Sequence, residues 1–108
     1  MIIREWRGRT SATRSEEYPR HFRNAVVPDL RRVPGFLGAM LTQRQDGERV
    51  EFVVLSRWTS MDAIRAFAGS DPDRAVVEPG AVAALTDYDQ TVRHYEVQED
   101  VAAAAPTP

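Results

Sequence analysis

The feature that most constrains the fold is an Asp-Gly pair between two apolar, strand-like stretches. Residues 36–44 read FLGAMLTQR, residues 49–58 read RVEFVVLSRW, and Asp46-Gly47 lies between them. Asp-Gly suits a tight turn whose central residues take positive φ, so the pair predicts an antiparallel β-hairpin.

A long helix is predicted before the hairpin, over residues 13–33. Thr13 and Glu16 have the spacing of a capping box, in which hydroxyl and carboxylate satisfy two free amides. Pro28 is expected to bend or break the helix near Asn24, because its ring clashes with the carbonyl four residues earlier. One apolar stripe, with intervals of three or four residues, consists of Tyr18, Phe22, Val26, Leu30 and Val33.

The remaining segments complete a β-α-β-β-α-β order. Residues 1–9 are typical of a first strand, and Thr59 or Ser60 caps a short helix after the hairpin. A second helical patch is expected within residues 73–87 and a last strand over residues 88–99. This order predicts an α+β, ferredoxin-like domain with a four-stranded antiparallel sheet and both helices on one face.

The expected domain covers residues 1–98, and residues 99–108 form a tail expected to be disordered. The other sheet face is left uncovered, so a second copy is expected to pack there. The net charge of −2 argues against nucleic-acid binding. The chain has no cysteine, and its two histidines suggest no metal site. No apolar run approaches the roughly 20 residues of a membrane span, so a cytoplasmic location is the expectation.

Strand alternation identifies the residues that face the helices. Residues 50, 52, 54, 56 and 58 share one face of the third strand, and Trp58 ends it where the next helix begins. Trp58 is interpreted as the wall of a small aromatic-binding cavity; the alternative is a core residue with its indole N–H bonded to backbone. Arg4 and Trp6 share a face of the first strand. They could add a cation and a second aromatic wall, although surface solvation or a dimer-interface ion pair is the preferred interpretation of Arg4.

Four short motifs resemble the antibiotic biosynthesis monooxygenase-like domains of the dimeric α/β-barrel proteins. They are PGF at 34–36, the Asp-Gly turn, WTSMDA at 58–63 and the pair Asp71-Pro72. The likeness spans residues 1–98. It implies a homodimer whose sheets meet face to face, with a pocket between sheet and helices in each subunit.

The resemblance also implies a choice of activities. Members include oxygenases that need neither metal nor flavin and oxidise polycyclic phenols to quinones, while others degrade haem, isomerise or cyclise small molecules. Trp58 matches the oxygenase pattern, but Val54, Ile64 and Glu78 stand where it has asparagine, tyrosine and arginine. Val77 stands where the haem-degrading members have a histidine.

We therefore expect a cofactor-independent monooxygenase-like enzyme for a small aromatic or polyketide-type substrate. A non-oxidative isomerase, cyclase or ligand-binding protein is the alternative, and haem handling is less favoured. His94 and Trp58 are the candidate catalytic residues, with His94 as base or as a structural or dimer contact. His21, at the edge of the apolar stripe, is a second candidate base. The candidate substrate-binding residues are Tyr18, Phe22, Phe52, Val54, Ile64 and Phe67.

Overall fold

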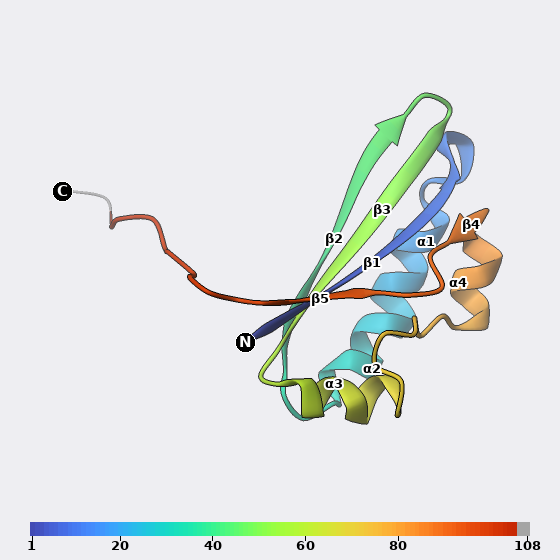
Figure 1. The fold of residues 1–108 in the computed structure, drawn as a ribbon. Helices are drawn as coiled ribbons and strands as arrows, with labels where there is room; N and C mark the ends of the chain where they lie inside the picture. The colour runs from blue at the N-terminus through green and yellow to red at the C-terminus, as the bar shows by residue number, and fades with distance from the viewer. Residues whose placement is uncertain (106–108) are drawn as a thin grey trace.

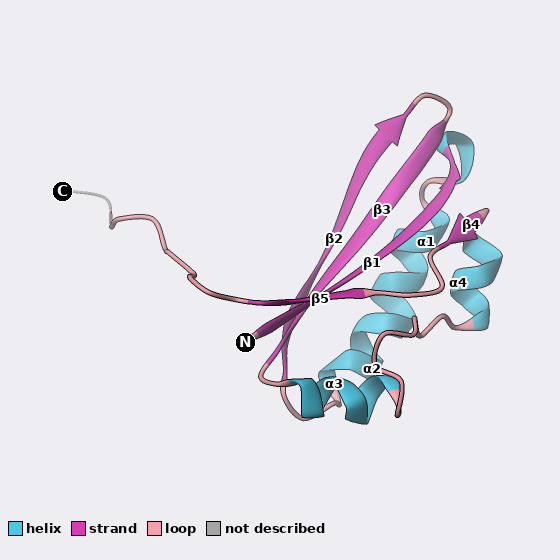
Figure 2. Cartoon of the chain, in the orientation of Figure 1, coloured by secondary structure: helices cyan, strands magenta, loops and turns pink. Residues whose placement is uncertain are grey.

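A computed structural model describes residues 1–105 of the chain. It contains one antiparallel sheet with helices packed on one face, as Figure 1 shows. Within residues 1–105 the other sheet face carries no helix, and residues 97–105, which follow β5 (Arg93–Glu96), extend away from the body of the domain (Figure 2). The fold is therefore the α+β, ferredoxin-like arrangement that the order of segments predicts.

The hairpin forms the longest part of the sheet. β2 (Phe36–Asp46) and β3 (Arg49–Trp58) pair antiparallel around the Asp-Gly turn, where Gly47 has a φ of 62°. β1 (Ile2–Ser11) pairs with the other side of β3, with Trp6 opposite Val54. The sheet order is thus β2-β3-β1, and the bounds of β3 match those predicted from the sequence.

The long helix forms at the predicted position, but it is not a continuous α-helix. It starts at Glu17 as α1 (Glu17–His21), passes through a π-helical segment η2 (Phe22–Val26) and ends as α2 (Val27–Arg31). The π-helical segment lies where Pro28 predicts a defect in the helix. Proline has no amide to donate to the carbonyl of residue 24, and the wider π-helical turn avoids the need for this hydrogen bond.

The predicted capping box is wrong. Residues Ala12–Arg14 form a short 3-10 turn, η1, and neither η1 nor α1 has a side-chain cap. The hydroxyl of Thr13 instead lies 3.1 Å from that of Ser11. Glu16 therefore has no reciprocal partner at the start of the helix.

The two later helices begin as predicted. Ser60 caps α3 (Met61–Ala68), its hydroxyl accepting from the amide of Ala63 at 3.2 Å. α4 (Pro79–Ala84) starts on a proline. Proline is tolerated in the first turn of a helix because the backbone amides there have no hydrogen-bond partner within the helix. Both helices pack on the sheet face that α1 and α2 also cover (Figure 1).

The predicted last strand is broken into two pieces. β4 (Asp87–Tyr88) and β5 both pair with β1, and residues 89–92 between them leave the sheet. These residues pair with another loop segment: the amide of Ala75 donates to the carbonyl of Gln90, and that of Val92 donates to Asp73. The break therefore builds a small two-segment cover over the inner face of the sheet.

Two apolar clusters fill the space between sheet and helices. One includes Tyr18, Phe52 and Leu85, and the other is built on Leu30, Trp58 and Ile64. Residues 97–105 form no helix or strand. The expected disorder of residues 99–108 stays a prediction, and residues 106–108 lie outside the described part.

Candidate active site

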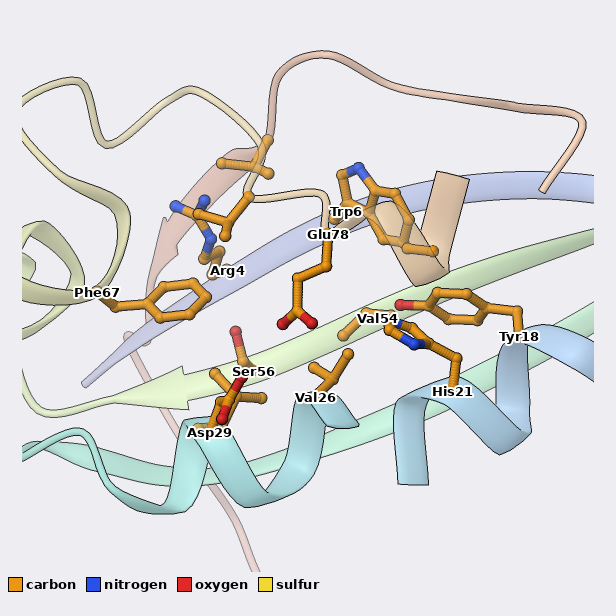
Figure 3. A pocket seen from close by; sticks show the side chains of 14 residues that line it. Arg4, Trp6, Tyr18, His21, Val26, Asp29, Val54, Ser56, Phe67 and Glu78 are labelled. Carbon is orange, nitrogen blue, oxygen red and sulfur yellow. The ribbon is translucent and has the colours of Figure 1, made fainter. Parts of the chain in front are cut away.

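A cavity lies between the inner face of the sheet and the helices (Figure 3), and members of both apolar clusters line it. Its volume of about 70 Å³ is enough for several water molecules. Every layer of the fold contributes to its wall. The lining residues are Arg4, Trp6, Tyr18, His21, Val26, Asp29, Leu30, Val54, Ser56, Phe67, Val76, Glu78, Ala81 and Val92.

Three of the predicted substrate-binding residues, Tyr18, Val54 and Phe67, line this cavity. Phe22, Phe52 and Ile64 are buried in the apolar clusters and do not line it. Sequence periodicity cannot make this distinction, because residues on one face of a helix or strand point toward core and cavity alike.

Trp58 does not line the cavity, which corrects its placement as a wall. Its side chain is fully buried and packs against Phe36 and Phe67, with ring centroids 5.4 Å and 5.3 Å away. The indole Nε1 donates to the hydroxyl of Ser56 at 2.9 Å. The bond is thus to a side chain and not, as the alternative interpretation had it, to backbone.

Arg4 is buried in the cavity wall instead of lying at the surface or in a dimer ion pair. Its side chain donates to the carbonyls of Pro72 at 2.6 Å and Arg74 at 2.9 Å. Burial lowers the pKa of Arg4 to about 10, with Asp73 opposing that effect, so the guanidinium remains charged at neutral pH. Arg4 therefore ties residues 72–74 to β1.

His94 lies beside Arg4 and outside the cavity lining. Its Nε2 is 2.9 Å from Nη1 of Arg4, and its Nδ1 is 3.3 Å from a carboxylate oxygen of Asp73. A guanidinium can only donate, so Nε2 accepts and the hydrogen belongs to Nδ1. His94 thus supports Arg4, and nothing places it within reach of a ligand in this cavity.

The cover over the cavity consists of residues 71–78 and 89–92, which we call the lid. Arg4 holds its first segment, and the indole of Trp6 holds the second by donating to the carbonyl of Asp89 at 2.9 Å. Both side chains come from the inner face of β1. Arg4 and Trp6 therefore both hold the lid against β1.

Glu78, at the end of the lid, turns its carboxylate into the cavity (Figure 3). It precedes α4 but does not cap that helix, and within residues 1–105 it takes part in no ion pair. Figure 3 shows the hydroxyl of Tyr18 pointing into the same space. Burial, together with Glu78, raises the pKa of Tyr18 well above its usual range, so the phenol remains a hydrogen-bond donor.

His21 lies in the same wall, next to Tyr18. Its Nε2 is buried and has no hydrogen-bond partner in the part of the chain that the structure describes. The ring fits because residue 80 is glycine: a Cβ there would lie 2.6 Å from Nδ1 of His21. The cavity thus presents a carboxylate, a phenol and an unsatisfied imidazole between apolar walls.

The family is identified by a match along most of the chain. The model of the antibiotic biosynthesis monooxygenase family matches residues 1–79, a range that includes β1, β2, β3 and Glu78. The chain belongs to this family. No curated protein matches it.

Solved structures of other proteins show the same fold. A monooxygenase of Streptomyces coelicolor in complex with nanaomycin D is 17% identical, with a TM-score of 0.68 over 95% of this chain and 92% of that one. A putative antibiotic biosynthesis monooxygenase of Deinococcus radiodurans is 18% identical, with a TM-score of 0.62 over 97% and 100%. The haem-degrading MhuD of Mycobacterium tuberculosis, with two haems bound, is 22% identical, with a TM-score of 0.64 over 94% and 100%.

The residues of this family member do not fit haem. Val77, to which the resemblance assigns the position of the haem-degraders' histidine, packs against the apolar cluster of Tyr18 and Phe52. Nε2 of His94 is engaged by Arg4, and the ring of His21 is confined against Gly80. Residues 1–105 hold no cluster of potential metal ligands, and none of their helices has the length and apolar character to cross a membrane.

Sequence reasoning missed Glu78 and gave Arg4 the wrong environment. Glu78 was not among the candidate site residues, and its contact with the cavity depends on the lid. A signal was present, because the resemblance assigns functional positions to residues 54 and 78, and both line the cavity. The third such position, Ile64, lies in the core.

Proposed function

We propose that this protein is a cofactor-independent monooxygenase-like enzyme that acts on a small aromatic substrate in the cavity. The observation that carries the proposal is the carboxylate of Glu78 facing the hydroxyl of Tyr18 between apolar and aromatic walls (Figure 3). Oxygenation without a cofactor needs a base, a donor for the resulting anion and an apolar cleft. Glu78, Tyr18 and the walls formed by Trp6 and Phe67 supply these.

The chemistry begins with proton removal. Glu78 takes the acidic proton of a hydroxyaromatic or α-carbonyl substrate, and Tyr18 donates to the oxygen on which negative charge develops. The electron-rich anion passes an electron to O2, and the two radicals combine. For a ring CH2 group the balance is one O2 consumed, one oxygen retained as a carbonyl and one released as water, so no external reductant is required.

We also propose that the protein is a homodimer joined through the open sheet face. That face carries Met40, which is 60% exposed, beside Leu55, and Tyr95, which is 45% exposed. Arg7, Arg9 and Arg44 surround Glu51 on the same face at 3.3–3.8 Å. An apolar strip with paired charges suits a self-complementary contact.

The experiment measures oxygen consumption with anthrone and with 1,4-dihydroxynaphthalene under air, against the rate without protein. We expect protein-dependent uptake that falls about 100-fold or more in Glu78→Gln, which keeps the shape but removes the base. Glu99→Gln, in the exposed tail, is the matched control and should leave the rate unchanged. Equal uptake by Glu78→Gln and the native protein would refute the assigned base.

A second candidate is a non-oxidative member of the fold that isomerises, cyclises or only binds its ligand. It is favoured by Val54 and Glu78, which put an apolar group and an acid in the cavity where the oxygenase pattern has asparagine and arginine. A ligand that binds and is converted without oxygen consumption, with equal rates in air and under nitrogen, would support this candidate over the oxygenase.

A further inference from the structure

The hydroxyl of Ser56 connects the cavity to the buried Trp58. Ser56 lies on the inner face of β3, is 5% exposed and lines the cavity. Figure 3 shows its oxygen directed toward the space between Phe67 and Glu78. Its only hydrogen-bond partner within residues 1–105 is the indole of Trp58 at 2.9 Å.

The direction of that bond determines what Ser56 can offer a ligand. An indole N–H is a donor only, so the serine oxygen is the acceptor. The serine proton must then point away from the indole, and no acceptor in the described residues receives it. The oxygen of this hydroxyl accepts from Trp58 while its proton is available, so the hydroxyl is suited to donate to a ligand oxygen.

The charge around Ser56 supports the same role. Arg4 is directly opposite Ser56 in the β1–β3 register, so the two side chains are neighbours on the inner face. Arg4 is a buried cation whose hydrogen bonds go to backbone carbonyls and His94. Its positive field therefore favours negative charge on an oxygen that Ser56 holds.

We propose that Ser56 donates its hydroxyl proton to the oxygen of the bound substrate, and that Trp58 is a positioning residue that fixes the direction of this donor. The proposal rests on the proposed function, since it needs an oxygen-bearing aromatic ligand in the cavity. It gives Trp58 a role without contact with the ligand, which its complete burial requires.

The test is a double-mutant cycle with 4-nitrophenolate as the probe, because hydrogen bonds to its oxygen move its absorption band. We expect Ser56→Ala to weaken binding about tenfold or more and to shift the band of the bound probe. Trp58→Phe should weaken binding in the native background but change it less than twofold in the Ser56→Ala background. Ile64→Val, in the same apolar cluster as Trp58, is the packing control and should leave binding unchanged.

A second measurement follows the indole N–H of Trp58 by NMR and does not depend on Trp58→Phe folding. The probe should shift this resonance in the native protein but not in Ser56→Ala, because the indole senses the ligand only through Ser56. Equal weakening by Trp58→Phe in both backgrounds, or an unchanged affinity in Ser56→Ala, would overturn the proposal while leaving the proposed function intact. A probe that does not bind the native protein at all would overturn both.

Discussion

Nη1 of Arg4 lies 2.9 Å from Nε2 of His94, and this contact decides the protonation of the histidine. A protonated ring would turn two donors toward each other, so the contact requires neutral His94. Since Arg4 holds the lid through the carbonyls of Pro72 and Arg74, the state of His94 is linked to closure of the cavity.

This link predicts a loss of stability in mild acid. Burial, and then Arg4, lower the pKa of His94 below its ordinary 6.5, against the opposing effect of Asp73. The unfolded chain therefore binds the proton more readily than the folded one, and stability falls as the pH drops below about 6.5. Melting temperatures between pH 5 and 8 measure this, and His94→Gln, which keeps an acceptor for Arg4, should flatten the slope. An unchanged slope in that variant would contradict the assignment.

Arg4→Met should open the lid. It removes the hydrogen bonds to the carbonyls of Pro72 and Arg74, which are part-buried, at roughly 1 kcal/mol for each bond. Urea unfolding measures the loss of stability, and faster hydrogen exchange at Ala75 and Val92, whose amides join the lid segments, localises it. Arg65→Met is the control, because Arg65 forms an exposed pair with Asp62. Slow exchange at both amides in Arg4→Met would show that the lid does not depend on Arg4.

The effect of Gly80→Ala on stability should have opposite signs in the presence and in the absence of the His21 side chain. Alanine in a helix is ordinarily worth about 1 kcal/mol over glycine, but here its Cβ would lie 2.6 Å from Nδ1 of His21. We expect Gly80→Ala to destabilise the native protein and to stabilise His21→Ala, where the ring is absent. Free energies of unfolding in urea give both values. Stabilisation in the native background would mean that the ring moves at no cost.

The proposed homodimer predicts a mass in solution of twice the monomer. Leu55→Glu places a charge at the centre of the open sheet face, next to Met40 and Glu5, and should dissociate the dimer. Sedimentation equilibrium measures the mass, and Glu96→Gln, at an exposed position of β5, is the control. A monomeric native protein at micromolar concentration would refute the proposed interface.

Haemin should not bind in the manner of the haem-degrading members. The resemblance assigns the position of their histidine to Val77, which packs against an apolar cluster, and Nε2 of His94 is already bonded to Arg4. Titration of haemin into the protein is expected to give no sharpened Soret band beyond that of free haemin. A saturable band that is lost in His21→Ala would contradict this expectation and assign His21 as the ligand.

The sequence by itself determined the features that neighbouring residues enforce. Asp46-Gly47 specifies the turn and alternation specifies the inner face of β3, because each depends on backbone preferences within a few positions. Ser60 and Pro79 mark helix starts for the same reason. The interruption caused by Pro28 was likewise predictable, although its π-helical form was not.

Only the tertiary structure decided which of these residues form the site. The lid brings Pro72 and Arg74 to Arg4, 68 and 70 positions away, and thereby places Glu78 in the cavity. The same packing encloses Trp58 in the core and leaves Ser56 at the cavity wall. Local patterns report which face a side chain occupies, whereas contact with a cavity depends on where distant segments close over that face.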